Sequence, residues 1–359
     1  MKLRTMNSMR PRHPLKHRRQ SGFVLVLALW AAVIVLLLAG MLDRHVDARL
    51  EQARLIRLRI QDELDMLSTR NTLLYLLGTQ RNTRAGLTTT AAGEADPDSD
   101  QGALRIDPIG GEIALDASPY RGLGEVRFSL QDESGLIALN SESQVDLQRV
   151  LQVFDADEVK TSRLLDALAD YRDSNSLSRL NGAEAAEYAG LAEPPPANMP
   201  LRSAAEITRV LGWREWLLTH PGFQVHEWFS TLRVAAFNPN VMPETLLAHL
   251  PGMNADKAAR VVALRREEPF RALPDFDMRT DIELAWAEDQ YRFFPSDTLQ
   301  LRTWRKGASH ANLLTLQLTP LSQHGPWQIT SSYRIRQGSQ DDAHEAPSHL
   351  FSTRTLPAP

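Results

Sequence analysis

A run of 23 residues without a charged side chain, from Gln20 to Leu42, constrains this chain more than any other feature. At about 1.5 Å per helical residue, such a run can cross the roughly 30 Å hydrocarbon core of a bilayer. Gly22 stands between a basic segment and the apolar run, whereas a secretory signal places its cleavage site after the apolar core. If the chain is cut at Gly22, the apolar helix stays in the mature protein and forms its new N-terminus.

The segment before the apolar run is strongly basic. A basic block beside an apolar helix stays cytoplasmic by the positive-inside rule, so we expect the C-terminal body to be translocated. An ordinary single-pass anchor without processing fits the same pattern. Residues 1–22 contain no acidic residue and seven basic ones: Lys2, Arg4, Arg10, Arg12, Lys16, Arg18 and Arg19.

Length and composition limit the number of domains and the kinds of binding site that the chain can have. The length of 359 residues allows about two domains beyond the membrane helix. The chain has no cysteine, which excludes disulfides, thiolate metal sites and cysteine nucleophiles. Without the seven leader cations, 33 basic residues face 44 acidic ones, a net charge of −11. This balance argues against a phosphate-binding surface and is compatible with bound divalent cations.

The apolar helix is predicted to continue far beyond the membrane. Apolar residues recur at three- and four-residue spacing after Leu42, and Gly78 is a plausible stop. The resulting helix of some 50 residues exceeds the usual globular length. A coiled-coil stalk is the alternative, but no a/d heptad is sustained.

Alternation of apolar and polar residues predicts strands on both sides of a long helical region. Residues 79–102 are expected to form a mobile loop, and residues 145–287 are expected to be mostly helical, with loops at 173–182 and 193–200. A sheet domain interrupted by an inserted helical domain, an α+β fold, accounts for this order. The strands are expected at 104–107, 112–115, 125–131, 299–303, 313–318 and 327–334.

Residues 238–276 resemble a helix-hairpin-helix unit, with a hairpin at Gly252 and a Pro-Phe closure at Phe270; residues 136–151 are a weaker relative. Such modules often bind DNA through backbone amides exposed by hairpin glycines. Here Asn254 stands where a second glycine is common, and five basic residues are balanced by five acidic ones. We therefore expect no nucleic-acid partner.

The segment 170–188 has oxygen donors at close spacing, a glycine for a sharp turn and a downstream glutamate, which suit a hard cation such as calcium. The spacing differs from that of an EF-hand, and a solvated turn with capping Asp and Asn side chains is the alternative. The candidate metal ligands are Asp170, Asp173, Asn175, Asn181 and Glu184.

No catalytic set stands out in the sequence. It contains no Gly-x-Ser-x-Gly, His-Glu-x-x-His or Walker glycine loop. His249 lies on the apolar face of a predicted helix, where packing is expected. We predict that the chain is not an enzyme and has no catalytic residues and, apart from calcium, no cofactor.

Gly22-Phe23 followed by an uninterrupted apolar helix resembles the class III leader of type IV pilins and type II secretion pseudopilins. The resemblance implies that a prepilin peptidase cuts between Gly22 and Phe23 and methylates Phe23. Most members carry a glutamate at the fifth mature position, which is thought to neutralise a neighbour's N-terminal amine; this chain has Leu27. A carboxylate in lipid costs roughly 2.5–3.5 kcal/mol without a partner. With Leu27 at this position, the chain resembles the K-type minor pseudopilin, which lacks the glutamate and is the tip subunit with no neighbour above it.

The K-type resemblance extends over most of the chain. It implies a pilin-like long N-terminal helix packed on an antiparallel sheet, with a large inserted all-α domain that contains helix-hairpin-helix-like units. Asn181-Gly182-Ala183-Glu184 matches a family motif in a domain that can bind calcium, although serines leave this loop less acidic than usual. The expected divisions are a leader at 1–22, the membrane and periplasmic parts of the helix at 23–42 and 43–78, the two parts of the sheet at 79–133 and 288–336, the α-domain at 134–287, and a tail at 337–359.

The resemblance implies a role in protein export across the outer membrane, in which the subunit caps the pseudopilus tip and helps to initiate its assembly. The implied partners are the I-, J- and H-type minor pseudopilins, the major pseudopilin and prepilin peptidase. The implied location is the bacterial inner membrane, with a cytoplasmic N-terminus and a periplasmic body. A membrane-anchored helix-hairpin-helix DNA-binding protein for DNA uptake and a minor type IV pilin are the alternatives.

Overall fold

The chain divides into two units, residues 1–61 and 62–359, and each is described by itself. The computed structural model describes residues 21–89, 106–154, 157–191, 193–220, 223–234, 237–250, 252–282, 290–337, 343–347 and 350–351.

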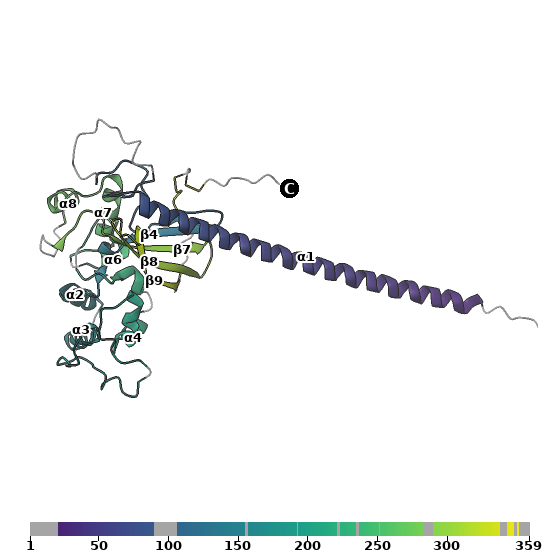
Figure 1. Ribbon diagram of the computed structural model, residues 1–359, viewed down its shortest axis with the longest axis horizontal. Coiled ribbons are helices and arrows are strands. Elements are labelled where there is room, and N and C mark those ends of the chain that lie inside the picture. Colours follow the sequence, from purple (N-terminus) through teal and green to yellow (C-terminus); the bar gives the residue numbers. More distant parts are fainter. Residues whose placement is uncertain are drawn as a thin grey trace, which may run out of the picture. The chain divides into compact units, whose positions relative to one another are not determined.

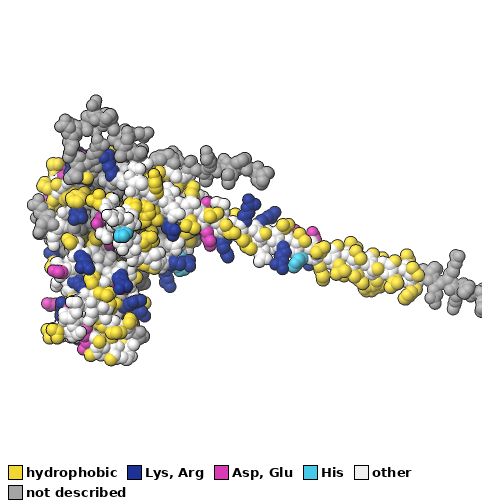
Figure 2. Space-filling view, viewed as in Figure 1, with side chains coloured by type: hydrophobic (Ala, Val, Ile, Leu, Met, Phe, Trp, Pro, Cys, Tyr) yellow, Lys and Arg dark blue, Asp and Glu magenta, His cyan; other side chains and the backbone are white. Residues whose placement is uncertain are grey.

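Helix α1, Ser21–Thr79, is the long N-terminal helix that the apolar periodicity predicts. In the first unit every side chain from Phe23 to Gln61 is exposed. Hydrophobic side chains cover the N-terminal half of the helix (Figure 2). Among the described residues, α1 is the one helix that is long and apolar enough to cross a membrane. An exposed apolar surface of this extent requires lipid or another protein to cover it.

The second unit is built around a five-stranded antiparallel sheet in the order β3-β4-β7-β8-β9 (Figure 1). Strands β4 and β7 are hydrogen-bonded neighbours, paired from Val126↔Arg305 to Asp132↔Leu299. The chain therefore leaves the sheet after β4 and re-enters it at the adjacent position. The strands are β3 Tyr120–Arg121, β4 Val126–Asp132, β7 Thr298–Arg305, β8 His310–Leu318 and β9 Trp327–Arg336.

Two predicted strands before β4 are wrong in the described residues. The residues at 106–107 are irregular, while 104–105 lie outside the described residues. Within 112–115 only Ile113 pairs, in an isolated bridge with Leu87. Gly110 and Gly111 both have positive φ, so the chain turns just before it would extend.

The predicted loop at 79–102 is also ordered at its start. Strands β1, Asn82–Thr83, and β2, Gly86–Leu87, form a short hairpin. Leu87 is fully buried in the core beside the sheet, which gives this polar segment an anchor that its composition does not reveal. The rest of the predicted loop, 90–102, lies outside the described residues.

The two faces of the sheet differ in polarity. On one face, Leu73 and Leu77 near the end of α1 pack in a core with leucines and Phe128 of the sheet. This packing confirms the predicted helix-on-sheet arrangement. Because side chains alternate along a strand, the other face carries a different set, in which polar side chains are buried: Arg127, Ser129, Gln131, Gln300 and Arg302.

Residues 133–297 supply the other described helices of the second unit and a separate core that includes Trp213, Trp216, Phe229 and Phe276. Figure 1 shows α2, α3 and α4 grouped apart from α7 and α8. A two-stranded parallel pair, β5 Ile137–Ala138 and β6 Phe229–Ser230, joins the start of this region to its middle. The helices are η1 Glu133–Gly135, α2 Val145–Val153, α3 Glu158–Arg172, η2 Ala204–Arg209, α4 Trp213–Leu218, α5 Val225–Trp228, α6 Glu244–Ala248, α7 Ala255–Glu267 and α8 Leu273–Thr280.

Candidate functional site

The predicted processing site lies at the beginning of α1. Gly22 belongs to the helix, the Phe23 side chain is 70% exposed and the Leu27 side chain is 61% exposed. The basic leader up to Gln20 lies outside the described residues. Leu27 is thus an apolar side chain on an apolar helical surface, and cleavage at Gly22 remains a prediction.

A buried ion pair fastens α7 to the segment that leads into the sheet. Arg265 Nη2 lies 2.8 Å from Asp116 Oδ2, and these two side chains are 4% and 5% exposed. Arg265 Nη1 also donates to the backbone oxygens of Pro239 and Met242, at 2.9 and 2.6 Å. Burial by itself raises the pKa of Asp116, but the Arg265 guanidinium and hydrogen bonds from Ser118 hold that pKa below its usual value. Arg265 is therefore a packing residue.

Two adjacent acidic side chains close the stem of the helical region. Asp132, at the end of β4, accepts hydrogen bonds from Ser134 N, Ser296 N and Ser296 Oγ at 2.6–2.7 Å. Ser296 lies just before β7, so this carboxylate joins the point where the chain leaves the sheet to the point where it returns. Burial raises the pKa of Asp132.

Glu133 connects the helical region to the sheet. Its carboxylate accepts hydrogen bonds from Thr231 N and from Gln300 Nε2, each at 3.2 Å, and it is 2% exposed. Burial, together with the charge of Asp132, raises the pKa of Glu133 to about 7 despite these hydrogen bonds. Glu133 therefore titrates near neutral pH.

The helix-hairpin-helix resemblance corresponds to α6, α7 and α8. Phe270 and Phe276 are fully buried, with ring centroids 4.8 Å apart. Asn254 begins α7 by accepting a hydrogen bond from Lys257 N at 2.9 Å, so it caps a helix where a DNA-binding hairpin often has glycine. Lys257 Nζ donates to the Gly252 carbonyl at 2.6 Å. With Arg265 buried as well, these contacts favour packing over DNA binding.

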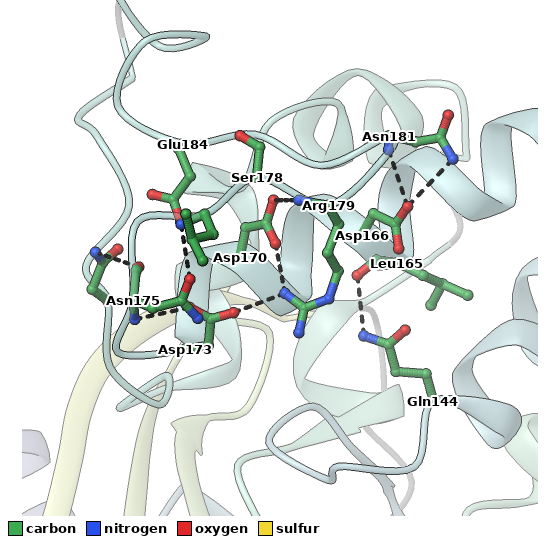
Figure 3. A network of polar contacts seen from close by, with 12 residues as sticks. Gln144, Leu165, Asp166, Asp170, Asp173, Asn175, Ser178, Arg179, Asn181 and Glu184 are labelled. Atoms are coloured by element: carbon green, nitrogen blue, oxygen red, sulfur yellow. Dashed lines mark hydrogen bonds and ion pairs between the residues drawn. The ribbon is translucent and has the colours of Figure 1, made fainter.

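The predicted calcium ligands lie in and beside the loop after α3 (Figure 3). Asp170 is fully buried, and its Oδ2 accepts a hydrogen bond from Arg179 N at 3.0 Å. Arg179 Nη1 lies 2.5 Å from Asp170 Oδ1 and 2.8 Å from Asp173 Oδ2. Asp173 Oδ1 accepts hydrogen bonds from Asn175 N and Nδ2, at 3.1 and 2.9 Å. The loop thus brings Asp170 and Asp173 together around a guanidinium, while Asn175 contacts Asp173.

The other two candidate ligands take different positions. The Asn181 backbone and side-chain nitrogens donate to Asp166 Oδ2, at 3.2 and 3.3 Å. Glu184 is 6% exposed, and its Oε1 has no hydrogen-bond partner. Burial, together with the charges of Asp170 and Asp173, raises the pKa of Glu184.

This arrangement does not fit a bound calcium ion. Calcium takes six to eight oxygen ligands around one point, whereas Arg179 lies between the two aspartates and Asn181 contacts a different carboxylate. In the part of the chain that the structure describes, no group of three or more His, Asp or Glu side chains could hold a metal ion. The orphaned Glu184 oxygen is the one feature here that favours a cation.

Sequence reasoning missed the residues that pair these charges. Arg179 lies inside the candidate loop, and counting its charge against those of Asp170 and Asp173 could have revealed it. Position 182 must be glycine for a steric reason, because an added Cβ would lie 1.9 Å from Asp170 Oδ2. No sequence signal links Asp116 to Arg265, which are 149 residues apart.

Part of the chain matches the model of a known protein family. Residues 128–220 match the family model described as Type II secretion system (T2SS), protein K. A chain of the crystal structure of the GspK-GspI-GspJ complex from the enterotoxigenic Escherichia coli Type 2 Secretion System is 13% identical, with a TM-score of 0.43. That match covers 59% of this chain and 80% of the solved chain. No curated protein matches the chain.

A long apolar N-terminal helix, an antiparallel sheet and a helical region inserted between neighbouring strands define a pilin-like α+β protein. The match at residues 128–220 extends from β4 through α4, across the start of the inserted region. Over these residues the chain is similar to the type II secretion system protein K family.

Proposed function

We propose that this chain is a minor pseudopilin that caps the tip of the type II secretion pseudopilus and helps to initiate its assembly. One observation carries the proposal: residues 133–297 are inserted between the hydrogen-bonded neighbours β4 and β7. A region of this size attached to the side of a pilin-like sheet would obstruct a subunit stacked above it. A terminal subunit escapes this conflict.

The N-terminal helix supports the anchoring step. Its exposed apolar surface from Phe23 to Leu42 is long enough to span a bilayer. We propose that it holds the subunit in the inner membrane, with the body in the periplasm, until assembly begins. Leu27 spares the helix the cost of a carboxylate in lipid, which a subunit without an upper neighbour would not recover.

The proposed partners are other pseudopilins. The solved complex named above holds GspK together with GspI and GspJ. We propose I- and J-type minor pseudopilins as the direct partners of this chain, with an H-type subunit and the major pseudopilin below them. The exposed apolar side chains of α1 are the surface that would pack against the helices of these subunits.

Processing at Gly22 is the first test of this proposal. Mass spectrometry of the protein extracted from membranes should find a mature chain that begins at N-methylated Phe23. The Gly22→Leu variant and cells without prepilin peptidase should both retain Met1. Retention of Met1 by the wild-type chain in cells with active peptidase would contradict the proposal.

A further inference from the structure

The loop after α3 holds an acidic cluster at a buried position, and a buried carboxylate requires a compensating positive charge. Asp170 has no exposed surface, and Asp173 follows it three positions later in the sequence. Glu184 approaches both closely enough for their charges to raise its pKa. The carboxyl groups of Asp170, Asp173, Glu184 and Glu187 therefore interact within one small region of the second unit.

Arg179 supplies the compensating charge from within the loop. One nitrogen, Nη1, contacts both aspartates, at 2.5 Å from Asp170 Oδ1 and 2.8 Å from Asp173 Oδ2. The backbone N–H of the same residue donates to the second oxygen of Asp170 at 3.0 Å. Arg179 thereby satisfies both oxygens of Asp170, once through its side chain and once through its backbone (Figure 3).

Gly182 leaves the space that Asp170 needs to contact Arg179. Any side chain at position 182 would collide with Asp170 Oδ2, since a Cβ there would lie 1.9 Å from that oxygen. Asn175 holds the far side of the loop by donating to Asp173 and accepting from Leu177 N at 2.8 Å. Asn198, outside the loop, adds a hydrogen bond from its Nδ2 to the Asn175 carbonyl at 3.1 Å.

We propose that Arg179 acts as a built-in counter-ion, so that this loop folds and keeps its shape without a divalent cation. The guanidinium occupies the space that a metal ion shared by Asp170 and Asp173 would need. This inference is independent of the secretion role, because it concerns only what holds the loop.

The test compares thermal unfolding of the full-length protein in detergent, in calcium chloride and in chelator. Wild-type Tm should be the same in both. The Arg179→Gln variant should have a lower Tm in chelator, and calcium should restore it by roughly 5 °C or more, the shift expected for a ligand at about 100 times its Kd. Arg163→Gln removes an exposed charge from α3 and is the matched control, which should behave like wild type.

Calorimetric titration with calcium chloride gives a second readout that does not depend on unfolding. Wild type should give no binding heat, whereas Arg179→Gln should bind calcium with the vacated carboxylates. Arg179→Lys retains a cation and should bind calcium more weakly than Arg179→Gln. Binding of calcium to wild type with a Kd below about 1 mM, or a wild-type Tm that falls in chelator, would overturn the proposal. An Arg179→Gln variant that calcium neither binds nor stabilises would overturn it as well.

Discussion

At the scale of single residues, the second unit depends on acidic groups that are buried and individually compensated. Asp116 is paired with Arg265, Asp132 accepts three hydrogen bonds, and Asp170 is paired with Arg179. Asp132 and Glu133 have only uncharged donors as hydrogen-bond partners, whereas Asp116 is paired with a cation. This difference explains why burial raises the pKa of Glu133 to about 7 while that of Asp116 stays below its usual value.

Glu133 should make stability depend on pH. Its folded-state pKa, about 7, lies above the ordinary value of 4.5, so its stabilising contribution is complete below pH 4.5 and is lost as pH rises through 7. Glu133→Gln has no proton to lose, so its free energy of unfolding should fall less over this range. The difference from wild type should reach on the order of 3 kcal/mol.

Urea unfolding of the full chain in detergent at several pH values measures this effect. Glu125→Gln, at an exposed position before β4, is the matched control and should follow the wild-type curve. Parallel curves for wild type and Glu133→Gln between pH 4.5 and 7 would show that Glu133 is not the titrating group.

At the scale of elements, the C-terminal part of α1 is a structural component of the second unit. Leu73 has no exposed surface and packs in one core with Phe128, Leu301 and Leu316 of the sheet. Thr69 Oγ1 also accepts a hydrogen bond from Leu123 N at 3.1 Å. The same helix thus has a solvent-exposed apolar part in the first unit and a packed part in the second.

Leu73→Ala should therefore destabilise the second unit by about 2–5 kcal/mol, since it leaves a cavity between helix and sheet. Tyr75 lies on the same turn with its side chain 63% exposed, and Tyr75→Ala should change stability by less than about 0.5 kcal/mol. Urea unfolding followed by tryptophan fluorescence distinguishes the two variants. Equal effects would mean that the helix end is not packed on the sheet.

The sequence predicts those elements whose periodicity is regular. Helix α1 and strands β4, β7, β8 and β9 were expected because their apolar residues repeat with helical or strand spacing over many positions. The hairpin at Leu87 escapes prediction, because a single buried residue anchors it within polar sequence, and of the strand expected at 112–115 only a bridge at Ile113 forms. The role of Arg179 is not predicted either, because it depends on how the loop after α3 folds back onto Asp170 and Asp173.

At the scale of the whole molecule, the inserted region is held to the sheet at several points that are distant in sequence. Asp132 bonds to Ser296 across its stem, Glu133 bonds to Thr231 and Gln300, and Gln131 Nε2 donates to Val241 O at 2.9 Å. Arg265 adds the ion pair with Asp116. These contacts make the sheet and the insert a single packed unit.

Tip placement is the central claim, and labelling of assembled pseudopili tests it most directly. The chain has no cysteine, so Leu321→Cys, at a position 98% exposed, introduces a unique site for maleimide-gold. Electron microscopy of pseudopili assembled with this variant should show gold at one end of each filament. Gold particles spaced along the filament length would contradict the account.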